Sequence, residues 1–232
     1  MIIKKISIII PCFNEEKTIK KVIEKIKQYN KYELEIIIVN DGSTDGSTKI
    51  LEGIKEKNIK ILNHKINSGK GRAIQTGVRV VSGDIVIIQD ADLEYSPTDF
   101  DILFKPFEEA DADVVYGSRF LGGSGYVRLH YYFHYLANKI LTNICNLFTN
   151  LNMSDMETGY KLFKKDVIQS INLTENSFGI EPEITIKLAK KKFKFFEVGI
   201  SYRGRSYSEG KKITAKDAII ALFCIFKYGL LG

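Results

Sequence analysis

Cysteine is scarce in this sequence, and the cysteines that are present lie far apart. Cys12, Cys145 and Cys224 are the only three in 232 residues, and they form no C-x-x-C pair. A disulfide framework or a zinc knuckle needs closely patterned cysteines, so neither is expected. The scarcity favours a reducing cytoplasm.

Long apolar runs are also missing. The longest late run, Ala218–Phe226, falls well short of the roughly 20 residues that a helix needs to span a bilayer. The first residues, "MIIKKISIIIPCF", are apolar but contain no small-residue cleavage site, so we interpret them as a strand and not as a signal peptide. We therefore expect no transmembrane helix.

Two motifs that mark common nucleotide-binding proteins are absent. No stretch matches G-x-x-x-x-G-K-[ST], and no G-x-G-x-x-G follows the first expected strand, so P-loop NTPases and Rossmann dehydrogenases are disfavoured. The glycine-rich stretches "GSTDGST" and "NSGKGRA" are interpreted as turns and helix caps, although the helices after them could still offer free N–H groups to an anion. No repeat or linker divides the chain, and one domain over residues 1–232 is expected.

The composition is that of a basic globular protein. A hydrophobic content of 44% is enough to fill a sizeable core, and the formal net charge is +6. This charge suits an anionic partner, which could be a nucleotide, a nucleic acid or an acidic membrane surface. Charge alone does not choose among these partners.

Strand and helix patterns alternate along the first half of the chain. An apolar run over Ile6–Ile10 ends at Pro11 and is followed by apolar residues at helical spacing, and similar pairs recur up to "DIVIIQDADLEY". Continuous apolar strands of this kind indicate a parallel sheet that is buried on both faces, with ligands at the carboxyl ends of its strands. Asp41, Asp90 and Asp92 lie at such ends.

Three carboxylates follow one of these strands. The stretch "IIQDADLEYSP" places Asp90, Asp92 and Glu94 where the chain leaves the core. Like charges at this spacing repel, so a metal ion or a metal-bound polyphosphate would explain the cluster. A solvated turn rich in acids is the alternative, and these residues alone do not decide between the two.

Six blocks in this order give the chain a family resemblance. They are "SIIIPCFNEEKTI", "IIIVNDGSTDGS", "NSGKGRAIQTG", "GDIVIIQDADLEYSP", "VVYGSRF" and "DMETGYKLF". Together they resemble the family 2 glycosyltransferases of GT-A fold, within the branch of dolichyl-phosphate mannose synthase and the polyprenyl-phosphate glycosyltransferases. The resemblance implies an α/β fold with a Rossmann-like, mostly parallel central sheet flanked by helices and a C-terminal extension on the acceptor side. It divides the domain into a nucleotide-sugar-binding half over 1–122 and an acceptor and membrane half over 123–232.

The resemblance also implies roles for single residues. Asp90, Ala91 and Asp92 match the D-x-D motif, whose two aspartates hold Mg²⁺ or Mn²⁺ against the diphosphate of the donor, and Glu94 is a candidate third ligand. The residues implied to contact the nucleotide are Pro11, Phe13, Glu15, Val39 and Asp41. Purely structural roles are the alternatives: Pro11 would only end a strand, and Asp41 would only begin a turn.

Further cations and carboxylates are implied to act on the reacting groups. Arg119 in "GSRF" matches an arginine near the sugar diphosphate, and Arg205 and Lys211 match a pair of cations that closes over the phosphates. Arg128 resembles the cation that receives an acceptor phosphate. If the acceptor is instead a sugar hydroxyl, Asp155 or Glu157 in "DMETGY" would take its proton.

These features predict an inverting, metal-dependent enzyme that moves a hexose of mannose or glucose type from a nucleotide diphosphate sugar to polyprenyl phosphate. Transfer to a sugar hydroxyl of a glycan or glycolipid is the enzymatic alternative, and a non-catalytic module that binds nucleotide sugar or anionic lipid is the alternative of another class. Two apolar segments, Tyr126–Phe148 and Ala215–Leu231, favour peripheral contact with the cytoplasmic membrane face over core packing or a dimer contact. An oligomer is possible, and no nucleic acid partner is expected.

Overall fold

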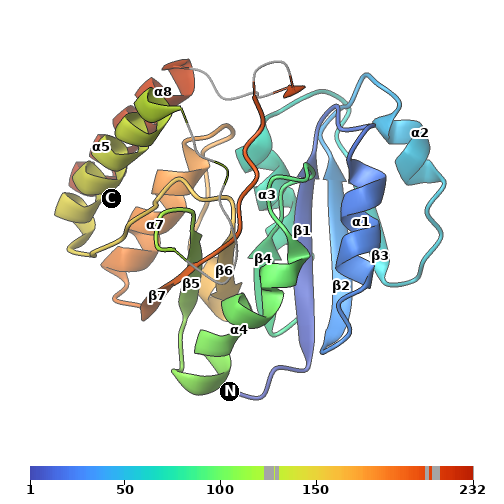
Figure 1. The fold of residues 1–232 in the computed structure, drawn as a ribbon, viewed down its shortest axis with the longest axis horizontal. Coiled ribbons are helices and arrows are strands. Elements are labelled where there is room, and N and C mark those ends of the chain that lie inside the picture. The colour runs from blue at the N-terminus through green and yellow to red at the C-terminus, as the bar shows by residue number, and fades with distance from the viewer. Residues whose placement is uncertain (123–127, 129–130, 207–208, 211–214, 232) are drawn as a thin grey trace.

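The computed structural model is an α/β fold built on one central sheet (Figure 1). It describes residues 1–122, 128, 131–206, 209–210 and 215–231. The described part contains seven strands in the order β3-β2-β1-β4-β6-β5-β7. The strands are β1 (Lys5–Cys12), β2 (Glu33–Asn40), β3 (Ile59–Asn63), β4 (Ile85–Ile88), β5 (Val114–Ser118), β6 (Lys161–Lys164) and β7 (Phe195–Gly199).

Most strand pairs are parallel, as the alternating sequence pattern predicts. Strands β3, β2, β1 and β4 pair in parallel, and so do β5 and β7. Strand β6 lies between β4 and β5 and is antiparallel to both. The sheet is therefore mostly parallel, and the predicted fold class is confirmed.

Helices cover both faces of the sheet, which explains why its strands are apolar on both sides. They are α1 (Ile19–Lys27), α2 (Ser47–Glu52), α3 (Lys70–Val78), α4 (Phe100–Glu109), α5 (Tyr132–Thr149), α6 (Lys165–Gln169), α7 (Ile180–Lys190) and α8 (Ala215–Leu231), with a short 3₁₀ turn η1 (Pro97–Asp99) before α4. One core cluster joins α1, α2 and α4 to one face of the sheet, and the other joins α3, α5, α6, α7 and α8 to the opposite face.

The first strand is longer than its sequence indicates. Strand β1 runs through Pro11 to Cys12, whereas a stop at Pro11 is expected from the sequence. The last residue of β1 that pairs with β4 is Ile9. Pro11 has the same orientation as Ile9, so its nitrogen faces the β4 side beyond that last pair, where no ladder bond is lost.

Helices α5 and α8 lie side by side at the upper left of Figure 1. Both pack against α7, and buried residues such as Cys145 and Cys224 belong to the core cluster on this side of the sheet. Their other faces carry large apolar side chains that remain exposed. These are Tyr132, Phe133, Tyr135, Leu136, Ile140 and Leu147 on α5, and Ile219, Ile220, Phe223, Phe226, Leu230 and Leu231 on α8.

Within the described residues, no helix combines the length and the hydropathy that a membrane crossing requires.

Candidate active site

A cavity of about 780 Å³ opens at the carboxyl ends of the central strands. Most of the residues predicted from the sequence line it. They are Pro11, Phe13, Glu15, Asp41, Asp90, Ala91, Asp92, Glu94, Arg119 and Arg205. The topology brings these residues together because β1, β2 and β4 are parallel neighbours whose chain exits lie at one edge of the sheet.

Four predicted residues are not among these lining residues. Val39 is buried within β2, and Asp155 is buried behind Arg119. Arg128 lines a second, smaller cavity. Lys211 lies outside the residues that the structure describes. The roles predicted for these four residues stay predictions.

The three carboxylates after β4 are held by two cations. Lys70 Nζ is 2.8 Å from an oxygen of Asp90, and Arg205 Nη2 donates to Asp92 at 2.7 Å. Arg205 also donates from its backbone N–H and from Nε to Glu94, at 2.8 and 3.2 Å. The charge repulsion expected between these carboxylates is thus offset by side chains from distant parts of the chain.

Asp92 is the carboxyl group most strongly affected by this crowding. Its side chain is almost fully buried, and Glu94 and Asp90 add negative charge nearby. Burial and these two neighbours raise the pKa of Asp92 to about 8, although the charge of Arg205 acts in the opposite direction. A cation of higher charge at this point would stabilise the ionised form.

The oxygens of this cluster are not arranged as a complete site for a divalent ion. Within the described part of the chain, no group of three or more His, Cys, Asp or Glu side chains is positioned to hold a metal ion. The chemistry of the donors nevertheless fits Mg²⁺ or Mn²⁺, which prefer carboxylate oxygens. In this structure the guanidinium of Arg205 contacts one oxygen of Asp92 and one of Glu94, and Lys70 contacts Asp90, so a metal ion at this cluster would compete with both cations.

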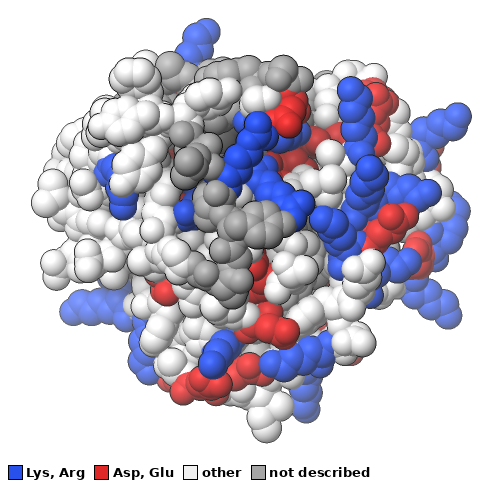
Figure 2. All heavy atoms as spheres, in the orientation of Figure 1, with Lys and Arg blue, Asp and Glu red and all other residues white. Residues whose placement is uncertain are grey.

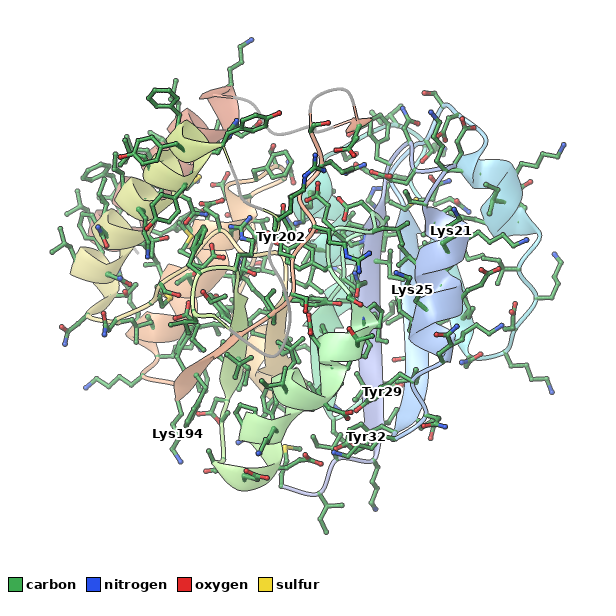
Figure 3. The ribbon with its side chains drawn as sticks, in the orientation of Figure 1. Lys21, Lys25, Tyr29, Tyr32, Lys194 and Tyr202 are labelled. Carbon is green, nitrogen blue, oxygen red and sulfur yellow. The ribbon has the colours of Figure 1, made fainter. Side chains whose placement is uncertain are left out.

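Arg205 makes contact with a third carboxylate on the opposite wall. Its Nη1 lies 3.3 Å from Glu15 Oε1, so the guanidinium connects the loop after β1 with the loop after β4. The hydroxyl of Tyr202 donates to the other oxygen of Glu94 at 2.6 Å, and Figure 3 shows this tyrosine near the centre of the view. The segment around Arg205 therefore closes over the carboxylate cluster.

Asp41 has a clear local role. Its carboxylate accepts hydrogen bonds from the backbone N–H groups of Ser68 and Gly69, at 3.0 and 2.7 Å, and contacts His64 Nδ1 at 2.6 Å. Gly69 has a φ of +97°, which residues with a side chain rarely adopt. Asp41 thus fixes the loop that leads into α3, and its predicted contact with the base stays a prediction.

Arg119 and Asp155 form a buried pair on the other side of the cavity. Arg119 donates to Asp155 from its backbone N–H, Nε and Nη2, at 3.0, 2.7 and 2.7 Å. Burial alone would raise the pKa of Asp155, but the charge and hydrogen bonds of Arg119 outweigh it and lower that pKa. A carboxylate with a lowered pKa and occupied oxygens is a poor proton acceptor, so this geometry suits the positioning of Arg119 better than general-base chemistry.

Glu157 has the opposite properties. It lines the cavity, and among the described residues its buried Oε1 has no hydrogen-bond partner. Burial and the nearby charge of Glu181 raise the pKa of Glu157 to about 7, against the opposing charges of Lys161 and Arg119. A carboxyl group with such a pKa can accept a proton near neutral pH.

One chain of buried charges is not indicated by the sequence patterns. Lys70 contacts both Asp90 and Glu181, and Glu181 Oε2 lies 2.5 Å from Nζ of the fully buried Lys161. Lys70 could have been found, because "NSGKGRA" places a lysine at the start of a helix that begins beside the strand ends. Glu181 and Lys161 lie in apolar stretches that indicate only core packing.

The part of the cavity wall formed by α5 and α8 is mixed, because His134, Asn138 and Asp217 line it together with apolar residues. Phe133 and Leu141 come from α5, and Ala218 comes from α8. Phe120 and Phe178 add further apolar surface to the same cavity. The cavity therefore extends from a charged floor at the strand ends to the two helices whose outer faces are exposed and apolar.

Comparison with known proteins places this geometry in a family. Residues 7–171 match the model of the family described as "Glycosyl transferase family 2". An uncharacterized protein of Methanocaldococcus jannaschii is 30% identical over 93% of this chain and 98% of its own length. A dolichyl-phosphate beta-glucosyltransferase of Trichomonas vaginalis is 28% identical over 92% of this chain and 69% of its own length. A dolichol-phosphate mannosyltransferase of Pyrococcus furiosus is 29% identical over 90% of this chain, which spans 60% of that protein.

Solved structures show the same fold at lower sequence identity. Glucosyl-3-phosphoglycerate synthase of Mycobacterium tuberculosis, in complex with Mn²⁺, UDP and phosphoglyceric acid, superposes with a TM-score of 0.74 at 18% identity, over 99% of this chain and 80% of its own. The same synthase has also been solved with Mg²⁺ and UDP. The matched family description covers most of the chain and includes the D-x-D carboxylates at the strand ends, and the chain therefore belongs to glycosyl transferase family 2.

Proposed function

We propose that this glycosyltransferase is an inverting, metal-dependent enzyme that moves a hexose of mannose or glucose type from a nucleotide diphosphate sugar to polyprenyl phosphate. The observation that carries the proposal is the two-sided cavity, with carboxylates and cations on its floor and apolar residues of α5 and α8 on its wall. A charged floor suits a diphosphate and a metal ion, and the apolar wall residues suit a hydrocarbon chain. The dolichyl-phosphate and dolichol-phosphate transferases among its relatives support the same acceptor class.

The donor is proposed to bind at the floor of the cavity. Asp90, Asp92 and Glu94 would hold Mg²⁺ or Mn²⁺, which supplies positive charge to the diphosphate leaving group. Arg205 then leaves Asp92 and turns its guanidinium to the donor phosphates, where a planar cation can form paired hydrogen bonds. The nucleotide-bound relatives of the same fold support a nucleotide sugar as the donor.

The acceptor is proposed to approach from the side of Arg119. A phosphate monoester is already anionic near neutral pH, so it attacks without a general base. Arg119 lines the cavity and is held in one orientation by Asp155, and a fixed guanidinium can orient an anionic acceptor. In this scheme Asp155 acts through Arg119 and not on the substrate.

The exposed faces of α5 and α8 are proposed to rest on the cytoplasmic membrane surface. Phe133 on α5 and Phe223 on α8 are 80% and 67% exposed, which is unusual for phenylalanine. An apolar helix face of this kind can lie in the headgroup layer without crossing the bilayer. The same two helices contribute apolar residues to the cavity lining, so a membrane-bound acceptor could reach the cavity from their side.

Transfer of labelled sugar to a short-chain polyprenyl phosphate in detergent tests the proposal. We expect transfer that needs Mg²⁺ or Mn²⁺ with at least one of the UDP- or GDP-linked hexoses. Asp155→Asn should retain part of the activity, because no base is needed. Failure of the wild-type protein with every donor that binds would reject the lipid phosphate acceptor.

One observation favours the second candidate, transfer to a hydroxyl group. Glu157 offers an unpartnered carboxyl oxygen in the cavity and has a raised pKa of about 7. A general base contributes on the order of 10² to 10⁴ in rate, so with a glycan acceptor, or with phosphoglyceric acid, Glu157→Gln should abolish most of the turnover. Donor binding without hydrolysis or transfer to any acceptor would instead indicate a non-catalytic binding module.

A further inference from the structure

A second cavity of about 590 Å³ lies beside the donor cavity. Its described lining residues are Thr18, Lys25, Leu93, Arg128, Arg203, Arg205 and Glu209. Arg205 lines both cavities, and the other six residues are absent from the lining of the larger one. The two cavities are therefore neighbours that share one guanidinium.

The second cavity is strongly basic. Four of its lining residues are Lys25, Arg128, Arg203 and Arg205, against a single acid, Glu209. Figure 2 shows lysine and arginine side chains gathered over α1 and beside it, and Lys25 belongs to this helix (Figure 3). A concave surface lined mostly by positive charge concentrates negative ions, so the expected ligand is an anion.

The one acid shows where that anion would sit. Glu209 Oε2 accepts two hydrogen bonds of 2.7 Å, one from Arg128 Nη1 and one from the backbone N–H of Ser206. Arg128 is steadied by a second bond of 3.0 Å from Nη1 to the carbonyl of Gly204. The Ser206 and Arg128 bonds lower the pKa of Glu209 to about 2, so its carboxylate is ionised under ordinary conditions. The Glu209 carboxylate thus occupies an anion-binding position formed by the Arg128 guanidinium and the Ser206 backbone N–H.

We propose that this second cavity is an accessory phosphate site, in which a phosphate group replaces the Glu209 carboxylate on Arg128 and Ser206 and gains contact with Arg203 and Lys25. Arginine and backbone N–H groups together are a common recognition set for phosphate. A phosphate brings three oxygens and more charge than a carboxylate, so it can engage more than one cation at once. The carboxylate cluster belongs to the other cavity, so apart from the shared Arg205 this site is distinct from the proposed donor site and does not depend on the proposed reaction.

Because Arg205 lines both cavities, ligand binding in the second cavity should affect the carboxylate cluster. Arg205 is held by Asp92 and Glu94 in this structure, and it also faces the second cavity. A phosphate bound there would attract this guanidinium away from the carboxylates. By linkage, a metal ion on the carboxylates and a phosphate in the second cavity should each strengthen the binding of the other.

Titration with inorganic phosphate, without nucleotide or metal, tests the site directly. Arg128→Gln and Arg203→Gln should each weaken binding by about fivefold or more, since each removes a charged hydrogen-bond donor. Glu209→Gln should tighten binding several-fold, because it removes the competing charge. Lys27→Gln is the control. It removes one positive charge from α1, the helix that carries Lys25, but Lys27 pairs with Glu56 and lines neither cavity.

Vesicles identify the source of the phosphate. Phosphatidylcholine vesicles with and without phosphatidic acid are compared, so that contact through α5 and α8 is subtracted. Binding of inorganic phosphate with the predicted variant pattern indicates a soluble phosphate compound as ligand. If the protein instead binds vesicles that contain phosphatidic acid but not inorganic phosphate, and this binding is lost in Arg128→Gln and enhanced in Glu209→Gln, the ligand is a lipid headgroup.

Three results would overturn the proposal. One is phosphate affinity that changes no more in Arg128→Gln than in Lys27→Gln. Another is a Glu209→Gln variant that binds phosphate no better than the wild type. The third is a rise in the acceptor KM of Arg128→Gln with no change in phosphate binding, which would assign Arg128 to the reacting acceptor. Each readout is a binding measurement or a KM, so failure of the site and failure of the proposed transfer are distinguishable.

Discussion

The replacement Asp155→Asn removes the charge from one partner of the buried Arg119–Asp155 ion pair. Asp155 is fully buried, its partner Arg119 is 9% exposed, and the two share hydrogen bonds at 2.7 Å on both carboxylate oxygens. Asn138 donates to Asp155 as well, at 3.1 Å. Asparagine keeps the shape of the side chain but leaves the guanidinium of Arg119 buried without a counter-charge.

The size of the effect follows from this burial. Breaking a buried ion pair by neutralising one partner costs about 3 to 5 kcal/mol, and the amide oxygen of asparagine still accepts one hydrogen bond. We therefore expect a loss of about 3 kcal/mol in the free energy of unfolding, or roughly 6 to 12 °C in Tm for a chain of this size. Arg119→Gln should cost a similar amount, and the double variant should cost less than the sum of the two.

Urea unfolding at neutral pH measures these differences. The pKa of Asp155 is lowered in the folded state, so its contribution is present above the ordinary carboxyl pKa and is lost as pH falls through the folded value. The gap between the wild type and Asp155→Asn should therefore close in acid. A loss below about 1 kcal/mol at neutral pH, or additive single variants, would refute the inference that this pair orients Arg119.

Three further predictions concern the metal, the core and the membrane. Arg205→Gln should bind Mn²⁺ about tenfold more tightly in calorimetry without nucleotide, because the competing guanidinium is gone from Asp92, and unchanged or weaker binding would count against that competition. Hydrogen bonds to the Glu35 carboxylate outweigh its burial and lower its pKa to about 2. Glu35→Gln should therefore lower the free energy of unfolding by about 3 kcal/mol at neutral pH, and this loss should vanish as pH falls toward 2. A difference in urea unfolding that does not depend on pH would contradict this prediction. Phe133→Gln with Phe223→Gln should lower binding to phospholipid vesicles about tenfold without changing Tm, since both rings are exposed, and equal vesicle binding would contradict membrane contact through these helices.

The sequence was most informative where local pattern and topology agree. Continuous apolar runs predicted a mostly parallel sheet, and this alone placed Asp41, Asp90 and Asp92 at one edge. Strand β6 was not predicted, because four residues between longer elements carry too little pattern to fix an antiparallel partner.

The contacts that the sequence could not supply are those between distant segments. Arg205 and Asp92 are 113 positions apart in the sequence, and a local sequence pattern cannot predict a contact over such a separation. Asp155 and Glu157 are two residues apart and equally plausible as bases in the sequence, yet one is tied to Arg119 and the other has an unpartnered oxygen. Only the packing of the loops around them separates the two.

Calorimetry of UDP and of GDP with Mn²⁺, on the wild type and on Asp92→Asn, tests most directly whether this cavity is a metal-dependent nucleotide-sugar site. Urea unfolding first establishes that the variant is folded, which is expected because Asp92 lies beyond the end of β4 and outside the core clusters. We predict that at least one nucleotide binds the wild type only with the metal, and that the folded variant loses this binding by about 30-fold or more. Nucleotide affinity that is the same without Mn²⁺, or the same in Asp92→Asn, would contradict the account.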